Sequence, residues 1–264
     1  MIQNTNTTII CPCNDGEASL LIDIAKKLFF DVRISRQGWG AVLSKEPPET
    51  FLGLRKNVIV VEMPDVKKEE ELGKSHNLFI IDHHKYSDMN RYKPISSLEQ
   101  FTCLISYHLD RWEMGVVLND RGYIYALIEN GYSDEEIRKI RQFDLSAQGY
   151  KPEDFDSLAK DYFKGYIYND RFFIIETMHN KTSYLADLHF LENEKRKVHL
   201  DLVVFVMEQE RIKEINFYGT PAMTLMLYNH FGGYCGGDEN VSMFWGKETP
   251  DISKKDFLNF INNV

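Results

Sequence analysis

Residues 78–84 read Leu-Phe-Ile-Ile-Asp-His-His, an apolar run that ends in an acid and two histidines. Four consecutive apolar residues, including isoleucine and phenylalanine, predict a short strand that is buried on both faces. Open α/β sheets bind ligands beyond the carboxyl ends of their strands, and carboxylate and imidazole groups are ligands of first-row metal ions. The run therefore predicts a metal or ligand site at the end of a buried strand. Taken alone, it also fits a surface turn that happens to hold three polar residues.

Two similar apolar runs lie before it, at residues 7–11 and 57–61. The first is followed by apolar residues at helical spacing over residues 16–30, and the second by a charged, helix-sized connection. Strands that alternate with helices form parallel sheets. Residues 115–120, Gly-Val-Val-Leu-Asn-Asp, predict one more short sheet element. Residues 1–145 are therefore predicted to form a doubly wound α/β domain with a parallel sheet.

The second half of the chain has a different pattern of predicted strands and helices. Residues 146–165 are mostly polar and predict a connecting helix or linker. Residues 166–177 and 200–218 are β-rich, and helical spacing lies between and after them. Residues 166–264 are therefore predicted to form a smaller α+β domain, and a length of 264 residues suits two domains.

The composition limits the classes of partner. Hydrophobic residues make up 43% and charged residues 27%, and the net charge is -9, so the chain has no overall basic character and long nucleic acid is not expected as a partner. No window approaches the ~20 apolar residues that a bilayer span needs, so no membrane partner is expected. A polar N-terminus without a signal peptide and only four cysteines indicate a cytoplasmic location. The oligomeric state stays open, and a homodimer is compatible with the sequence.

Candidate metal ligands recur where the predicted sheet elements end. Cys11, Cys13 and Asp15 follow the first strand, Glu62 follows the second, and Asp120 ends the last. The carboxyl ends of parallel strands lie along one edge of a sheet, so these side chains are expected to converge with the acid and histidines described above. A solvated charge explains any one of these residues, but it does not explain their recurrence at successive strand ends.

The order of these motifs resembles that of the DHH phosphoesterase superfamily. This family includes RecJ nucleases, nano-RNases, cyclic dinucleotide phosphodiesterases and family II pyrophosphatases. Its members carry His-x-Asp-x-Asp-Gly-x-x-Ser, an acid after the second strand, Asp-His-His and a later Asp-x-Gly. The similar positions in this chain are Cys11-Pro-Cys13-Asn-Asp15-Gly16-Glu-Ala-Ser19, Glu62, Asp82-His83-His84 and Asp120-Arg-Gly122.

The resemblance implies a centre of divalent metal ions, usually manganese. Asp15, Glu62, His83 and Asp120 would form one metal site, with glutamate in place of the family's aspartate at the second strand. A second site normally uses a histidine and an aspartate, which are Cys11 and Cys13 here. Thiolates are soft ligands that suit zinc or iron. The alternative is that the two cysteines are small residues packed at a strand end.

A glycine-rich segment near the end of the chain resembles the family's Gly-Gly-Gly-His loop. That likeness implies that Gly236, Gly237, Asp238 and Asn240 bind the far end of the substrate. The loop histidine is replaced by Asp238, and a carboxylate repels a phosphate unless a cation lies between them. Residues 214–218 also lack the arginine that relatives carry on a preceding strand. Phosphate recognition is therefore expected to differ from that of the family, or to be lost.

Two hypotheses about function follow from the resemblance. The first is a metal-dependent phosphohydrolase or phosphodiesterase that acts on a small nucleotide, a short oligonucleotide or another phosphoester. In this enzyme His84 would neutralise charge that develops on the phosphoryl group, and Asp82 would orient a histidine. The second is a catalytically inactive relative that acts as a binding or scaffold protein. The departures from the family pattern favour the second hypothesis, and the retained acids and histidines favour the first.

Overall fold

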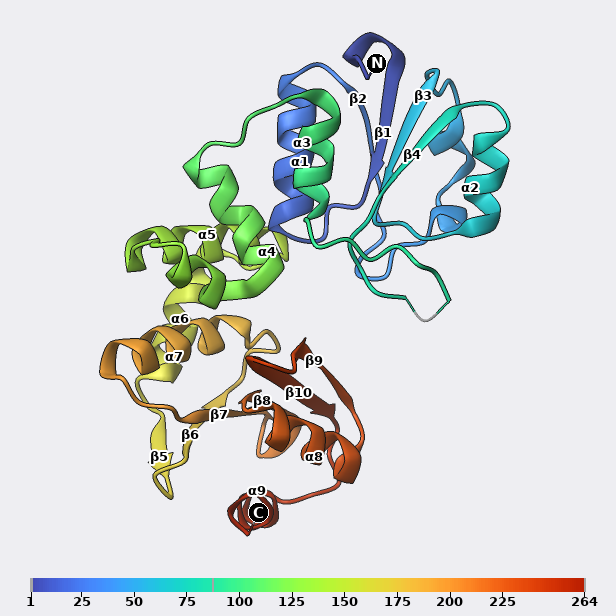
Figure 1. Ribbon diagram of the computed structural model, residues 1–264. Coiled ribbons are helices and arrows are strands. Elements are labelled where there is room, and N and C mark those ends of the chain that lie inside the picture. The colour runs from blue at the N-terminus through green and yellow to red at the C-terminus, as the bar shows by residue number, and fades with distance from the viewer. Residues whose placement is uncertain (1, 87, 264) are drawn as a thin grey trace. The chain divides into compact units, whose positions relative to one another are not determined.

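The computed structural model describes residues 2–86 and 88–263. The chain forms two compact units, Met1–Gly149 and Tyr150–Val264. The first unit holds a parallel sheet with helices on both faces, and the second holds a larger mixed sheet (Figure 1). This is the α/β fold class that the sequence predicts.

The first unit is built on a four-stranded parallel sheet with the order β2-β1-β3-β4. Every residue of the two central strands is buried, which is why these strands are continuous apolar runs. Helices α1 and α3 lie on one face of the sheet and α2 lies on the other (Figure 1). The strands are β1 (Thr7–Cys11), β2 (Asp31–Ile34), β3 (Asn57–Val61) and β4 (Asn77–Ile81), and the helices are α1 (Gly16–Lys27), α2 (Val66–Gly73) and α3 (Ser97–Ile105). Short 3-10 helices cover Asn4–Asn6, Leu43–Lys45 and Pro48–Phe51.

The strand order reverses between β1 and β3. From β1 the chain crosses through α1 to β2 on one side, and from β3 it crosses through α2 to β4 on the other. A reversal of this kind separates the loops at the carboxyl ends of the two central strands and leaves a crevice between them. The predicted ligands that follow β1, β3 and β4 therefore lie at the edge where open α/β sheets bind ligands.

The prediction of a sheet element at residues 115–120 is wrong. These residues belong to helix α4 (Arg111–Glu129). The helix begins with a capping box, in which Asp110 and Glu113 each accept a hydrogen bond from the other's backbone N–H. The helix contains a kink, since Gly122 and Tyr123 depart from helical dihedral angles and Tyr123 has a φ of 56°. Asp120 therefore comes from a helix, two residues before this kink, and not from a strand end.

The predicted linker contains the boundary between the two units. Helix α5 (Asp134–Ala147) begins at a capping box formed by Ser133 and Glu136, and the first unit ends after Gly149. Helix α6 (Pro152–Tyr162) follows and packs against α7 and β6 of the second unit. Most of the range 146–165 is thus helical.

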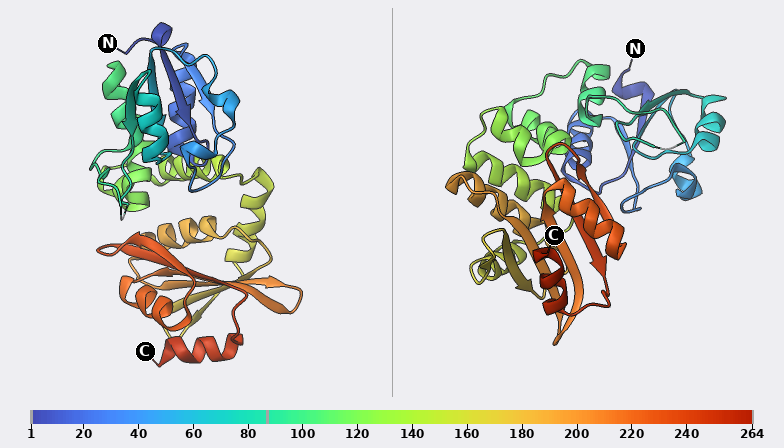
Figure 2. Two further views of the ribbon diagram at one scale, coloured as in Figure 1. Left: turned by 90° about the vertical axis from the view of Figure 1, so that its right-hand side faces the viewer. Right: turned by 60° about the horizontal axis from the view of Figure 1, so that its bottom comes forward.

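The second unit is built on a six-stranded sheet with the order β5-β6-β7-β8-β10-β9. Strands β6 and β7 pair in parallel, and the other neighbours are antiparallel. Helices α6 and α7 lie on one face, and α8 and α9 lie on the other (Figure 2). The strands are β5 (Tyr166–Tyr168), β6 (Phe172–Thr177), β7 (Asp201–Glu208), β8 (Arg211–Gly219), β9 (Tyr234–Asp238) and β10 (Ser242–Glu248), and the remaining helices are α7 (Ser183–Arg196), α8 (Pro221–Phe231) and α9 (Lys254–Asn262).

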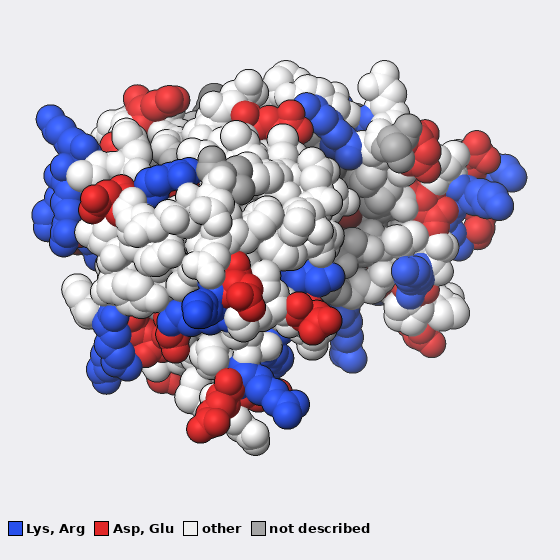
Figure 3. Space-filling view, turned by 90° about the horizontal axis from the view of Figure 1, so that it is seen from below, with Lys and Arg blue, Asp and Glu red and all other residues white. Residues whose placement is uncertain are grey.

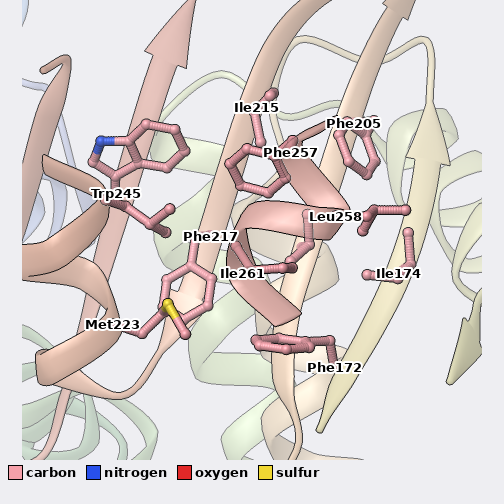
Figure 4. Packing of buried hydrophobic residues seen from close by; sticks show 12 residues of the cluster. Phe172, Ile174, Phe205, Ile215, Phe217, Met223, Trp245, Phe257, Leu258 and Ile261 are labelled. Carbon is pink, nitrogen blue, oxygen red and sulfur yellow. The ribbon is translucent and has the colours of Figure 1, made fainter. Parts of the chain in front are cut away.

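The core of the second unit lies between its sheet and helices α8 and α9. Phe205 and Trp245 of the sheet lie against Phe257 of α9, and Phe217 belongs to the same cluster (Figure 4). The indole of Trp245 stacks on the Phe257 ring at a centroid distance of 6.0 Å, and its Nε1 donates a hydrogen bond of 2.7 Å to the carbonyl of Gly232. An aromatic core with a satisfied indole N–H fixes this face of the sheet.

The glycine-rich segment predicted as a loop is mostly a strand. Gly236 and Gly237 lie in the edge strand β9, which pairs with β10. A Cβ on Gly236 would lie 2.8 Å from the Phe244 ring, so glycine leaves room for that ring on the facing strand. Gly237 has a φ of +106°, and a Cβ there would meet the Ser242 carbonyl at 2.6 Å. The glycines are therefore explained by the close pairing of this hairpin.

Within the described residues, no helix combines the length and the apolar character that crossing a bilayer requires.

Candidate metal centre

The imidazole of His83 lies among three carboxylates at the carboxyl edge of the parallel sheet. Its Nε2 is 3.3 Å from Oε1 of Glu62, 3.4 Å from Oδ2 of Asp120 and 4.0 Å from Oε2 of Glu17. His83 follows β4 and Glu62 follows β3, whereas Asp120 belongs to α4 and Glu17 belongs to α1. Four segments that are distant in sequence thus bring one imidazole and three acids together.

Three of the facing atoms are buried and form no hydrogen bond. They are Oε1 of Glu62, Nε2 of His83 and Oδ2 of Asp120. Buried polar atoms in folded proteins are almost always paired, because an unpaired one loses its solvation without replacement. A cation placed among these atoms would satisfy the carboxylate oxygens and the imidazole lone pair together. This arrangement is what a metal-binding site requires.

The backbone at Glu62 adopts an uncommon conformation. Its φ is 48°, in the left-handed region, directly after β3 ends at Val61. The conformation is held by a hydrogen bond of 2.9 Å from its N–H to the carbonyl of Ile81. A non-glycine residue in this region costs on the order of 1–3 kcal/mol, and such residues concentrate at functional sites. The turn separates the side chain of Glu62 from the apolar run before it.

The acids at this edge are strongly perturbed. Burial, reinforced by the neighbouring charge of Glu62, raises the pKa of both Asp15 and Glu17 to about 7. Burial, with Glu17 and Glu62 beside it, raises the pKa of Asp120 well above its usual range. Like charges that share a desolvated space cannot all ionise unless a cation joins them. The carboxylates therefore favour a bound cation at neutral pH.

Burial affects the pKa of His83 in the opposite direction from the pKa values of the acids. Burial lowers its pKa, but the Glu62 and Glu17 carboxylates raise it by more, so that the net shift is upward. In the absence of a metal, a proton on His83 is thus the charge that partly balances the acids.

Asp82 fixes the orientation of His84. Oδ1 of the fully buried Asp82 accepts hydrogen bonds from the backbone N–H of His84 at 3.0 Å and from its Nδ1 at 3.1 Å. Oδ2 of Asp82 accepts a bond of 3.1 Å from the hydroxyl of Tyr86. The hydrogen bond to Asp82 raises the pKa of His84. Burial raises the pKa of Asp82, but its hydrogen bonds with His84 outweigh that effect and lower it. The ring of His84 is therefore held, and its other nitrogen remains available for a ligand.

His84 also lies close to the other candidate ligands. One ligand atom from each of Glu62, His83 and His84 lies within 4.8 Å of the others, and so do ligand atoms of Glu17, His83 and Asp120. The two groups share His83.

Asp15 caps the start of helix α1. Its Oδ1 accepts a hydrogen bond of 2.8 Å from the N–H of Ala18. Among the described residues it belongs to neither of the two groups of close ligand atoms. Glu62 nevertheless raises the pKa of Asp15, so the two carboxylates share one electrostatic environment.

Gly16 permits α1 and α5 to approach closely at this end. Its N–H donates a hydrogen bond of 2.8 Å to Oδ1 of Asp144, and a Cβ at this position would lie 2.9 Å from the Asp144 Cα. Arg141 Nη1 donates a bond of 2.6 Å to the other oxygen of Asp144. The first turn of α1, with its two acids, is thereby fixed against α5.

The two cysteines lie in different environments. Cys11 is fully buried, and its Sγ donates to the carbonyl of Pro12 at 3.2 Å. Burial, with Glu62 nearby, raises the pKa of its thiol, which disfavours the thiolate. Cys13 is exposed, with its Sγ 3.5 Å from Oγ of Ser19. Neither cysteine belongs to a group of close ligand atoms in the part of the chain that the structure describes.

Glu17 is a buried acid of this site that was not predicted from the sequence. This acid stands in the first turn of a helix, where acids are common because they favour the helix dipole, so its type and position gave no signal. Its burial arises from the N-terminus of α3, where the N–H of Leu98 donates a bond of 2.7 Å to Oε1 of Glu17. That contact joins residues far apart in the sequence, and local spacing carries no sign of it.

The predicted substrate-binding residues belong to the second unit. Gly236 and Gly237 lie in β9, and Asn240 is exposed in the turn that follows. The side chain of Asp238 lies outside the described part of the structure. Their role in binding a substrate stays a prediction.

No protein-family model matches the chain, and no curated protein matches it either. Solved structures are similar to it, among them two of RecJ. A crystal structure of exonuclease RecJ bound to manganese has a TM-score of 0.42 and 8% identity, with 97% of this chain and 88% of that chain covered. RecJ from Thermus thermophilus in complex with Mn2+ has a TM-score of 0.45 and 11% identity, with 97% of this chain and 51% of that chain covered, so that this chain spans about half of its length. At this level of similarity, function has to be inferred from the site itself.

Proposed function

We propose that this chain is a metal-dependent phosphoesterase of the DHH type that acts on a small nucleotide, a short oligonucleotide or another small phosphoester. The observation that carries the proposal is that buried, unpaired carboxylate oxygens of Glu62 and Asp120 both lie beside the buried, unpaired Nε2 of His83 at the carboxyl edge of the sheet. The motif order in the sequence supports it, because these three residues stand where the family's metal ligands stand.

The residues present fit a divalent ion with hard or borderline character. Two carboxylates and one imidazole suit manganese, whereas zinc or iron held by thiolates finds less support because Cys11 is a buried thiol and Cys13 is exposed. A bound ion would lower the pKa of a coordinated water and polarise a phosphoryl oxygen.

His84 is suited to contact the phosphoryl group. Asp82 holds its ring through Nδ1, and the side chain is 47% exposed, so its other nitrogen can reach a ligand. The raised pKa favours the charged imidazolium near neutral pH. A positioned cation of this kind stabilises negative charge that develops on phosphoryl oxygens.

The charge distribution favours small substrates. The net charge is -9, and the face drawn in Figure 3 carries side chains of both signs scattered among uncharged residues. Long nucleic acid binds through many phosphate contacts along a basic surface. A short substrate needs only the local positive charge of the metal centre and His84.

A second candidate function is that of a binding or scaffold protein that has lost catalysis. The specific observation in its favour is that Cys11 and Cys13 stand where the family pattern has ligands of a second ion, and neither lies in a group of close ligand atoms among the described residues. Such a protein would bind one metal ion and lack the second ion that the family uses for hydrolysis.

The test begins with chelator-treated protein. Isothermal titration calorimetry with MnCl2 measures binding, and hydrolysis of bis(p-nitrophenyl) phosphate, short oligonucleotides, cyclic dinucleotides and pyrophosphate measures activity. We expect Mn2+ binding and hydrolysis in the natural protein, loss of both in His83→Ala, and retention of both in His108→Ala, an exposed histidine of the same unit. Binding without hydrolysis of any substrate would favour the scaffold, and no binding at all would refute the metal centre.

A further inference from the structure

Glu17 is placed as a metal ligand would be, although the motif pattern gives it no role. Its side chain is only 3% exposed. Oε1 accepts a hydrogen bond of 2.7 Å from the N–H of Leu98, and Oε2 lies 4.0 Å from Nε2 of His83. One oxygen is thus held by the backbone of α3, and the other faces the imidazole at the centre of the site.

Asp15 occupies a different place in the same turn of α1. Its Oδ1 is the N-cap acceptor for the N–H of Ala18. Glu17 shares with His83 and Asp120 a group whose ligand atoms all lie within 4.8 Å of one another, and Asp15 does not. The longer side chain of Glu17 reaches the cluster from inside the first turn, whereas the carboxylate of Asp15 serves the helix end.

A second observation shows that the cluster faces a missing partner. Oε1 of Glu62, whose side chain is 8% exposed, is buried without a hydrogen bond, and so are Nε2 of His83 and Oδ2 of Asp120. Two of these atoms are carboxylate oxygens of like charge beside the same imidazole nitrogen, which is unfavourable without a partner of opposite charge. The buried acids are therefore placed as the ligands of a cation would be.

We propose that Glu17 is a ligand of the metal centre together with Glu62, His83 and Asp120, and that Asp15 acts mainly as the N-cap of α1. This inference rests on the proposed function, which requires a divalent ion at this edge. The donor set is then three carboxylates and one imidazole, which selects a manganese-like ion over one that prefers sulfur ligands.

The hydrogen bond from the N–H of Leu98 also orients the carboxylate of Glu17. A backbone N–H that binds the second oxygen of a carboxylate fixes the direction of the first, as the partners of metal ligands commonly do. Leu98 lies in the first turn of α3, where the capping box of Ser96 and Glu99 forms the helix N-terminus. Metal binding at Glu17 therefore couples the ion to the start of α3.

Paired substitutions that remove only charge test this assignment. We expect Glu17→Gln to weaken Mn2+ binding by roughly 10–100-fold in calorimetry of the metal-free protein. Asp15→Asn keeps a good N-cap and is expected to bind Mn2+ with nearly natural affinity. Glu70→Gln, an exposed glutamate of α2, is the matched control and should change nothing. Circular dichroism confirms that each variant is folded. If Glu17→Gln does not fold, Glu17→Asp, which withdraws the carboxylate by one methylene, is expected to weaken binding in the same way.

The outcomes separate this inference from the proposed function. If His83→Ala loses Mn2+ while Glu17→Gln keeps it, Glu17 is not a ligand and the proposed metal centre stands. If Asp15→Asn weakens binding and Glu17→Gln does not, the assignment of the two acids is reversed. If the natural protein binds no Mn2+, both the metal centre and the role of Glu17 are overturned.

Discussion

Each unit has a histidine with a buried Nε2, and the surroundings of the two imidazoles differ. In the first unit, Nε2 of His83 has no hydrogen-bond partner and faces acids, which raise its pKa against the effect of burial. In the second unit, Nε2 of His189 donates a bond of 2.7 Å to the carbonyl of Leu200, and its ring stacks on Phe173 at 5.3 Å. Burial lowers the pKa of His189. Burial alone thus does not identify a functional histidine, whereas an unpaired nitrogen among carboxylates does.

The strongest test of this contrast is removal of the imidazole from the first unit. His83→Ala is expected to weaken Mn2+ binding by on the order of 100-fold, because a direct ligand matters at least as much as the groups that orient it. The metal-free protein should also become less stable at neutral pH, since the protonated imidazole partly balances the three neighbouring acids. Calorimetry and urea unfolding measure the two effects. Unaltered Mn2+ affinity would show that the imidazole is not part of the centre.

The two units should respond to pH in opposite directions when no metal is bound. Burial raises the pKa of Asp15 and Glu17 from usual values of 3.8 and 4.5 to about 7. Their contribution to stability is fully present below these usual values and is lost, by a few kcal/mol, as the pH rises to about 7. His189 has a lowered pKa, so its contribution is present above its usual value of 6.5 and is lost as the pH falls below it.

Pulsed hydrogen exchange in urea can follow the two units separately. The protein is equilibrated at pH 5 or pH 7 and then labelled at one fixed pH. Peptides from β3 report on the first unit, and peptides from β7 report on the second. We expect β3 to be less protected after equilibration at pH 7 and β7 to be less protected after equilibration at pH 5. Addition of Mn2+ should abolish the loss in β3, because ionised carboxylates then bind the ion. Equal trends in both peptides would contradict the contrast between the units.

Removal of the imidazole from the second unit should have a purely structural effect. His189→Ala leaves the Leu200 carbonyl without that donor and removes the ring from its stack on Phe173. We expect a loss of about 1–3 kcal/mol in the free energy of unfolding and an unchanged affinity for Mn2+. Urea unfolding and calorimetry measure the two quantities. A weakened Mn2+ affinity in this variant would show that the second histidine is not merely structural.

The smallest expected effect concerns the two cysteines. Replacing Cys13 with serine exchanges one exposed polar group for another, and neither cysteine lies in a group of close ligand atoms among the described residues. Metal content measured by elemental analysis should therefore be the same in Cys13→Ser and in Cys11→Ser, although the second variant buries a hydroxyl and is expected to be less stable. A loss of zinc or iron in either variant would restore the thiolate-ligand alternative.

The sequence was sufficient for the parts of the site that follow apolar strands, although the prediction that β4 is buried on both faces is wrong because β4 is a partly exposed edge strand. The apolar runs before Glu62 and Asp82 are long enough to predict β3 and β4, and a strand end fixes the edge at which the next residue lies. Asp120 was assigned to the wrong element, because Val116 and Val117 favour strands while the cap at Asp110 starts a helix. Tertiary context decided that segment.

Glu17 marks the limit of what the sequence could predict. A glutamate after a helix start is usually solvated, and only the packing of α3 against α1 buries this one. The glycine-rich segment presented the same difficulty, since a strand without side chains and a loop have similar composition. Both features depend on partners that are distant in sequence, and one sequence does not specify these partners.

The position of Trp245 makes tryptophan fluorescence a reporter of unfolding in the second unit. Of the three tryptophans, Trp245 is 1% exposed in the core of the second unit, whereas Trp39 and Trp112 of the first unit are 67% and 38% exposed. A buried indole emits at shorter wavelengths than a hydrated one, so the blue edge of the fluorescence spectrum comes from the second unit. A red shift of this blue edge during denaturation consequently shows when the aromatic core of the second unit becomes hydrated. The emission of Trp39 and Trp112 supplies a reference from more exposed indoles within the same spectrum.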